Sequence, residues 1–439
     1  MIEATRAGTH ADAVARLAQP VIDGEWASGL AIGLVDGNSV ETYGFGRIGD
    51  SDSARPNEDT VFEIGSISKV FTALVLADST VRGDVRLDQP VNELLPAGAS
   101  LASPDGQAVT LKHLATHSSG LPALPPNLTP TSLDDPYAQY TPALLYQSLT
   151  STPLASTPGT KYAYSNFGAG LLGQVLADRE GTTYGALLAQ RITEPLGMNR
   201  TGRGLPADNV ASGHDADGAP VAYWEFDALA GAGAIRSSVS DMIRFARANL
   251  VRSNDALGRA LALAQEVHAD LPGSRVGLGW HIGHGGPLDG IRWHNGQTGG
   301  FHSFMAIDPG GQKAAILLAN TASVRLDELG VALLRALRGE TVSLNLPPTI
   351  AVSESVLGSY VGTYRLAPGF DLTVMADGTR LYLQATGQPR YRVFAASETT
   401  FFYRVVDAQV EFRKDAAGGV DALILRQGGR DLVASRVPE

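Results

Sequence analysis

The chain has 439 residues, enough for two or three domains at about 150 residues each. Hydrophobic residues make up 44% of the sequence and charged residues 18%, which predicts a folded chain with a substantial core rather than a disordered one. The formal net charge of −11 argues against a nucleic acid partner, and the absence of cysteine excludes disulfides, thiolate nucleophiles and cysteine-ligated metals.

The first residues, MIEATRAGTHADAVARLAQPV, carry charges where a signal peptide would have an uninterrupted apolar core. No run of about 18 apolar residues occurs, so we expect no membrane-spanning helix. The compartment stays open: periplasmic or secreted if a signal peptide has been removed, and cytoplasmic otherwise.

The N-terminal half mixes helices and strands. Residues 11–17 have helical spacing, and residues 29–49 predict a hairpin around the turn Asp36-Gly37-Asn38. Residues 65–83 carry apolar side chains at i, i+3 and i+4 spacing, which predicts a helix that begins at Gly65 and Ser66. Between residues 80 and 235 short helices alternate with long polar loops, and residues 121–136 are predicted to form an exposed loop.

Farther along, SDMIRFARANL predicts a helix with Ser240 as its N-cap. Residues 276–283 and 301–320 predict strands, the latter a pair joined by the turn Pro309-Gly310-Gly311. LDELGVALLRALRG predicts a helix that ends at Gly339.

NLPPTI then predicts a linker, and the pattern beyond it becomes all-β. Short strands alternate with Asp-Gly, Gly-Gly and Ser-Glu turns, which is typical of a small antiparallel barrel or sandwich. We therefore expect two domains, residues 1–345 and residues 346–439.

Ser66 and Lys69 stand at the start of the predicted helix of residues 65–83. The lysine follows the serine by one turn, on the same face. Free N–H groups at a helix start favour an oxyanion, and a desolvated lysine can take a proton from the serine hydroxyl. The pattern predicts a nucleophile with its base; the plain alternative is a helix cap followed by a solvated lysine.

A second motif, Tyr164-Ser165-Asn166, follows a Pro-Gly turn and precedes a Gly-rich helix. A tyrosine beside a lysine can relay a proton, because a positive charge favours the phenolate. The amide of Asn166 offers a donor and an acceptor for a substrate carbonyl or amide. The alternative is a core aromatic residue followed by a helix cap.

A third motif, WHNGQTGGF, runs from Trp293 to Phe301, includes His294 and comes just before a predicted strand. Its glycines, Gly296 among them, let the backbone approach a ligand closely. The N–H of Gln297 is the expected oxyanion donor at a strand edge. The alternative is a Gly-rich turn in which His294 makes a structural hydrogen bond.

With Ser-x-x-Lys, Tyr-x-Asn and a strand motif in this order, the chain resembles the penicillin-recognising serine hydrolases. Further segments are similar to the class C β-lactamase branch over roughly residues 10–338: FEIGSISKVFTALVLA, LKHLATHSSGLP, PGTKYAYSNFGAGLLG, EPLGM, GAGAIRSSVSDMIRFA and HNGQTGGFHSF. The resemblance implies an α+β fold, with an antiparallel sheet flanked by helices plus an all-helical subdomain. The tail resembles the lipocalin-like β domains of some members, which implies a small antiparallel β-barrel.

The resemblance also implies roles for the site residues. Ser66 would attack a carbonyl, Lys69 and Tyr164 would move the proton to the leaving group, and the N–H groups of Ser66 and Gln297 would hold the oxyanion. Asn166 would position the substrate. Water would then release the acid from the acyl-enzyme.

The third motif departs from the class C pattern, because His294-Asn295-Gly296 stands where those enzymes have Lys-Thr-Gly. His-x-Gly resembles the D-stereospecific peptidases and the peptidoglycan carboxypeptidase/endopeptidases of the family. A titratable side chain replaces a permanent charge, so we expect His294 to bind a carboxylate or polar group and efficient β-lactamase activity to be in doubt.

The expected substrate is a D-amino-acid-containing peptide or related amide. The alternatives are a carboxylesterase of small acyl esters with weak β-lactam turnover, and a non-catalytic sensor that binds penicillin-like ligands. No cofactor or metal is expected, since no carboxylate cluster accompanies His281-x-x-His284. The β domain either covers the mouth of the active site or assembles a homo-oligomer.

Overall fold

The computed structural model describes residues 8–50, 53–103, 106–204, 206–415 and 418–438, so part of the start examined for a signal peptide, residues 1–7, lies outside them. The helices are α1 (Ala11–Asp23), η1 (Gly65–Ile67), α2 (Ser68–Arg82), η2 (Val91–Glu93), α3 (Leu111–Ala115), α4 (Pro142–Ser151), α5 (Asn166–Arg179), α6 (Tyr184–Leu188), η4 (Ala189–Thr193), η5 (Asp227–Leu229), α7 (Ala230–Gly233), α8 (Val239–Leu250), α9 (Ala256–Gln265), η6 (Gly286–Leu288), α10 (Leu326–Leu337) and α11 (Glu354–Tyr360). Among the described residues, no helix has both the length and the apolar character needed to cross a bilayer.

The strands before residue 346 are β1 (Gly29–Asp36), β2 (Ser39–Gly46), β3 (Val61–Glu63), β4 (Gly213–His214), β5 (Pro220–Val221), β6 (Arg236–Ser238), β7 (Ala269–Leu271), β8 (Ser274–Val276), β9 (His281–Ile282), β10 (Arg292–Gln297), β11 (His302–Asp308) and β12 (Lys313–Ala319). Those after it are β13 (Gly362–Ala367), β14 (Phe370–Asp377), β15 (Arg380–Ala385), β16 (Arg390–Ala395), β17 (Thr400–Tyr403), β18 (Ala408–Lys414), β19 (Val420–Gln427) and β20 (Arg430–Arg436).

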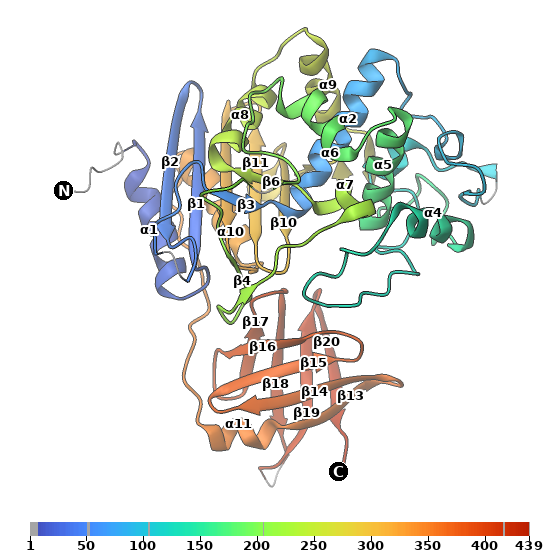
Figure 1. The fold of residues 1–439 in the computed structure, drawn as a ribbon. Helices are drawn as coiled ribbons and strands as arrows, with labels where there is room; N and C mark the ends of the chain where they lie inside the picture. Colours follow the sequence, from blue (N-terminus) through green and yellow to red (C-terminus); the bar gives the residue numbers. More distant parts are fainter. Residues whose placement is uncertain (1–7, 51–52, 104–105, 205, 416–417, 439) are drawn as a thin grey trace.

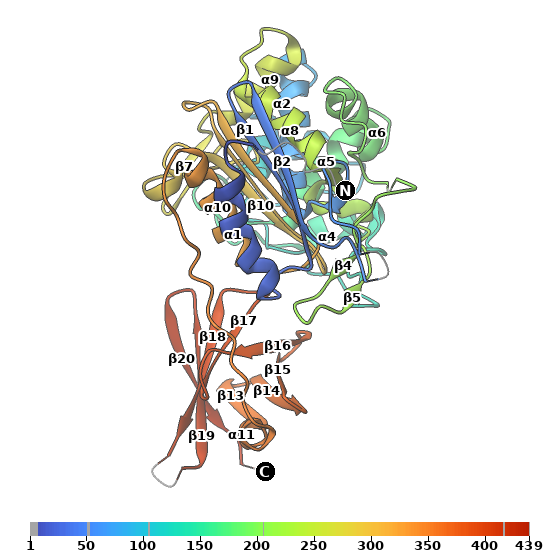
Figure 2. The same cartoon turned by 90° about the vertical axis from the view of Figure 1, so that its left-hand side faces the viewer.

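An eight-stranded antiparallel sheet lies at the centre of the first part, in the order β2-β1-β12-β11-β10-β9-β8-β7. The predicted hairpin of residues 29–49 is confirmed as β1 and β2, and the predicted pair around residues 309–311 as β11 and β12. Helices α1 and α10 cover one face of the sheet, and α8 and α2 lie on the other (Figure 1 and Figure 2). The strand predicted over residues 276–283 is interrupted, because Gly279 takes a positive φ of 72° between β8 and β9.

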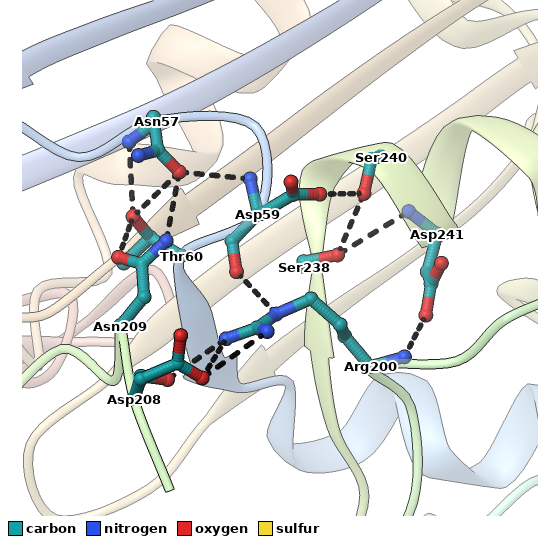
Figure 3. A network of polar contacts seen from close by, with 9 residues as sticks. All are labelled: Asn57, Asp59, Thr60, Arg200, Asp208, Asn209, Ser238, Ser240 and Asp241. Carbon is teal, nitrogen blue, oxygen red and sulfur yellow. Dashed lines mark hydrogen bonds and ion pairs between the residues drawn. The ribbon is translucent and has the colours of Figure 1, made fainter. Parts of the chain in front are cut away.

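A polar network anchors the loop before β3, which leads into the segment of Ser66 (Figure 3). Ser240 was predicted to cap α8, and this is wrong: Ser238 accepts the N–H of Asp241 at 3.4 Å, as an N-cap does. Ser240 instead donates to Asp59 Oδ1 at 2.7 Å, which ties the start of α8 to this loop. The network therefore fixes where the chain enters β3.

The chain after residue 361 forms a closed barrel of eight antiparallel strands, β13 to β20 in sequential order. Closure through β13 and β20 removes the free edges that a sandwich would keep. Of the two architectures that the sequence left open, the barrel is the one observed. It lies below the sheet in Figure 1, joined to α10 by residues 340–353, which have no helix or strand.

A helix precedes the barrel where the sequence predicted only strands. Residues 354–360 form α11, which lies at the end of the barrel far from the sheet (Figure 1). Its last residue, Tyr360, is fully buried and stacks on Phe412 with ring centroids 4.0 Å apart. Phe401 meets Phe412 edge-on at 5.6 Å. These aromatic side chains fill that end of the barrel.

Arg404 joins the barrel to the first part of the chain. Its guanidinium donates to the main-chain oxygens of Gly24, at 3.1 Å, and Glu25. It lies over the rings of Trp26, at 4.5 Å, and Phe394, at 3.8 Å. Arg404 is only 4% exposed, so this contact is buried, and removing the side chain would leave carbonyls without their donor.

Candidate active site

Ser66 lies in η1, the short turn between β3 and α2. Gly65 before it has a φ of 49°, a conformation that favours glycine. Ser66 is half-buried and caps no helix, since no side-chain cap is found at the start of η1 or α2. The plain alternative of a capping serine is therefore wrong.

Lys69 lies in the first turn of α2 and is 2% exposed, so it is not the solvated lysine of the plain alternative. Its Nζ lies 2.8 Å from Ser66 Oγ and 2.7 Å from the main-chain oxygen of Ala232. Burial lowers the pKa of Lys69 well below its ordinary value of 10.5. A neutral amine in this position can donate one N–H to Ala232 and accept the serine proton on its lone pair.

Tyr164 borders the same amine, with Lys69 Nζ 4.8 Å from the centre of its ring. We expected the lysine charge to favour the phenolate, but burial raises the pKa of Tyr164 well above 10, although a hydrogen bond with Ser66 opposes this. The phenol therefore stays protonated at neutral pH and is suited to donate a proton. Asn166 is the first residue of α5 rather than its cap, because Ser165 accepts the N–H of Gly168 at 2.9 Å.

The third motif begins within β10, and its later residues, Thr298, Gly299 and Gly300, form the turn just before β11, so the predicted place before a strand is confirmed. β10 pairs with β11 along its length but with β9 only at Arg292 and Trp293, so the edge after them is free of a strand partner. A Cβ on Gly296 would lie 2.0 Å from the main-chain oxygen of Ile64. Only glycine permits this approach between β10 and the turn that carries the nucleophile candidate.

The approach brings two main-chain nitrogens together. A Cβ built on Gly65 would lie 2.7 Å from the nitrogen of Gln297, and one on Gly296 would lie 2.9 Å from the nitrogen of Ser66. The Ser66 and Gln297 nitrogens thus belong to backbone segments in direct contact. Two neighbouring main-chain N–H groups are the kind of donors from which an oxyanion hole is built.

His294 lies at the other end of the open edge and is 1% exposed. Its Nδ1 donates to the main-chain oxygen of Asn295 at 2.6 Å, so Nε2 is the acceptor nitrogen, and it has no hydrogen-bond partner among the described residues. Burial, with the nearby His281 and Lys69, lowers the pKa of His294 well below 6.5. We expected a histidine that charges near neutrality; the buried ring is neutral there, and this weakens its interpretation as a carboxylate ligand.

Two further histidines, which sequence reasoning did not place in the site, complete the cluster. His281 lies opposite Trp293 in the sheet register, 4.9 Å from the ring of His294, and burial lowers its pKa to about 4. His117 packs against Tyr164 at 4.4 Å and accepts the N–H of Ser165 at 3.1 Å. The sequence analysis considered His281 only as half of a metal motif, because its contact with His294 depends on strand register.

A serine hydroxyl on a buried amine, bordered by a protonated phenol, is the chemistry of a serine hydrolase. No group of three or more histidine, aspartate or glutamate side chains in the described part of the chain could hold a metal ion. His284, the second histidine of the His281-x-x-His284 pair considered as a metal motif, is exposed.

The chain belongs to the beta-lactamase family, whose model matches residues 14–338, and the protein is a serine hydrolase. Residues 346–436 match a domain of unknown function, DUF3471. The chain is 29% identical to the D-alanyl-D-alanine-carboxypeptidase/endopeptidase AmpH of Escherichia coli K12 over 319 residues, which cover 68% of this chain and 80% of that one. It is 26% identical to penicillin-binding protein 4* of Bacillus subtilis 168 over 455 residues, covering 93% and 95%.

Among solved structures, a class C beta-lactamase superposes with a TM-score of 0.67 at 23% identity, covering 77% of this chain and 100% of that one. At this identity the similarity concerns the fold alone. It confirms the predicted β-lactamase-like α+β fold for the first part of the chain.

Proposed function

We propose that the protein forms an acyl-enzyme on Ser66. The observation that carries this proposal is the 2.8 Å contact between Ser66 Oγ and the buried Lys69 Nζ, together with the lowered pKa of the lysine. Lys69 takes the hydroxyl proton as Ser66 attacks the carbonyl carbon. The N–H groups of Ser66 and Gln297 hold the oxyanion that forms.

Collapse of the tetrahedral intermediate then requires a proton for the leaving group. Tyr164, a protonated phenol beside Lys69, donates it and recovers a proton from the lysine. Water attacks the acyl-enzyme by the reverse sequence and releases the acid, which restores Ser66. Asn166, the first residue of α5, contacts the polar part of the substrate through its side-chain amide, which can both donate and accept.

The proposed substrate is a D-amino-acid-containing peptide or a related amide. Support comes from AmpH, a D-alanyl-D-alanine-carboxypeptidase/endopeptidase by name, at 29% identity, and from the His-x-Gly motif at His294. A carboxylesterase is the second candidate, and the neutral His294 favours it, because an uncharged ring attracts a substrate carboxylate less than a lysine would.

A panel of p-nitrophenyl esters, D-amino-acid p-nitroanilides and nitrocefin, compared by kcat/KM, separates these candidates. Ser66→Ala should lower kcat by about 10³-fold or more and abolish covalent labelling by a phosphonate or penicillin. Labelling that persists in Ser66→Ala, detected by intact mass, would remove Ser66 from the proposed role. A non-catalytic sensor would release at most one equivalent of p-nitrophenol.

A further inference from the structure

A cavity of about 510 Å³ lies at the mouth of the barrel and reaches Gln297 of the candidate site. On the catalytic side it is lined by Gln297, Thr298 and Gly299, the residues that continue β10 from the oxyanion position. On the barrel side its lining is mainly apolar and includes Leu372, Leu383, Val406, Leu425 and Leu432. The volume lies within the range of small-molecule sites, about 300–1,000 Å³.

The cavity lies at the end of the barrel that faces the first part of the chain. α11 and the stack of Tyr360 on Phe412 fill the far end of the barrel, as described above. At the near end the Gln297 side chain donates to the main-chain oxygen of Val405 at 3.2 Å, so the strand of the oxyanion donor touches the rim of the barrel. Gln297 therefore lies where the cavity meets the segment of Ser66.

The direction of β10 decides which half of the substrate reaches the cavity. Tyr164, the proposed proton donor to the leaving group, lies near the His294 end, with ring centroids 6.4 Å apart. The leaving group therefore lies at that end of the strand. The acyl half extends the opposite way, from the carbonyl at Gln297 past Thr298 and Gly299, and this path leads into the barrel.

We propose that the barrel cavity is the acyl subsite of the enzyme and selects substrates whose acyl group ends in an extended apolar chain or ring. This inference rests on the proposed function of Ser66. An eight-stranded barrel has an interior wide enough for one small ligand. Here that ligand is the apolar end of a substrate whose carbonyl lies at Ser66.

p-Nitrophenyl esters from acetate to decanoate test the proposal, because their leaving group is constant. We expect kcat/KM to rise with chain length, by up to about fourfold per methylene, until the cavity is full. Val406→Trp narrows the cavity and Leu432→Asp makes its lining polar, so both should lower the octanoate-to-acetate ratio at least tenfold. Val433→Asp is the matched control, since Val433 neighbours Leu432, is 51% exposed and does not line the cavity.

An octanoate-to-acetate ratio that is unchanged in both cavity variants would overturn the acyl subsite. Calorimetry on Ser66→Ala with octanamide and acetamide separates this failure from a failure of the proposed function, because binding needs no turnover. Octanamide should bind tighter than acetamide, and Val406→Trp in the same background should remove the difference. Equal binding of the two amides would contradict the subsite even if the esters are hydrolysed.

Discussion

The Nζ of Lys69 donates to the main-chain oxygen of Ala232 at 2.7 Å, and this bond orients the amine. One N–H bond is held by the carbonyl, so in the unprotonated amine the lone pair is free to face Ser66. Since α7 carries Ala232, a short helix far along the chain sets the direction of the proposed base.

The buried Lys69 predicts a pH-dependent stability. Its pKa is lowered in the folded state, so between that pKa and 10.5 the unfolded chain binds one proton more than the folded chain. The free energy of unfolding must therefore rise with pH in this window, by at most about 1.4 kcal/mol per pH unit. Lys69→Met should show a smaller rise between pH 7 and pH 9.

Urea unfolding followed by tryptophan fluorescence measures this difference, because all four tryptophans precede residue 346. Lys161→Met, at an exposed lysine, should keep the slope of the parent protein. Equal slopes for the parent and Lys69→Met would mean that Lys69 is charged in the folded protein.

Tyr164→Phe should affect substrates according to their leaving group. A p-nitroanilide needs a proton on its departing nitrogen, so its kcat should fall about 10²–10⁴-fold. A p-nitrophenolate leaves without protonation, so the ester should lose much less activity. Tyr162→Phe, which removes a neighbouring phenol, is the control; equal losses on both substrates in Tyr164→Phe would contradict its role as proton donor.

His294→Lys should change substrate choice more than bond breaking. Hydrolysis of a neutral p-nitrophenyl ester should stay within about tenfold, a change near 1.4 kcal/mol, and turnover of a carboxylate-bearing β-lactam should improve.

Because the pKa of His294 is lowered by burial, KM of the parent enzyme for that β-lactam should not follow a histidine titration between pH 6 and pH 8. His284→Lys, at an exposed position, serves as control; loss of all activity in His294→Lys would place the ring in the proton relay.

Cleavage of the linker and loss of the Arg404 contact should together separate the two parts of the chain. Limited proteolysis should cut near Pro347 or Pro348, within residues 340–353 that lack helix and strand. The fragments should elute together in the parent protein and apart in Arg404→Ala, because charged hydrogen bonds contribute about 1.5–3 kcal/mol. Fragments that unfold on cleavage would count against two domains.

Much of the site could be predicted from local spacing. Ser66 and Lys69 meet because three residues make nearly one helical turn, and Gly296 was identifiable as a point of close backbone approach. The neutral state of His294 could not be predicted, since it depends on burial and on His281, which reaches it through strand register.

The elements of the fold also differ in how far the local sequence predicts them. Hairpins with Asp-Gly turns and amphipathic helices carry their own signal, as in residues 29–49. The helix α11 could not be predicted, because a seven-residue helix without a side-chain cap gives a pattern too short to recognise in the sequence. The contact of Gln297 with Val405 joins residues 108 positions apart, and no local pattern encodes it.

The closed barrel has a consequence for engineering. The connections after β15 and β17 line the cavity, and those after β13 and β19 lie directly beside residues that do, whereas the barrel closes through the pairing of β13 with β20. These connections are comparable to the recognition loops of an antibody, which vary in sequence on a constant framework. Libraries confined to these four turns, with Arg404 kept, would vary the surroundings of the cavity while Ser66 and Lys69, about 300 residues or more earlier in the sequence, stay untouched.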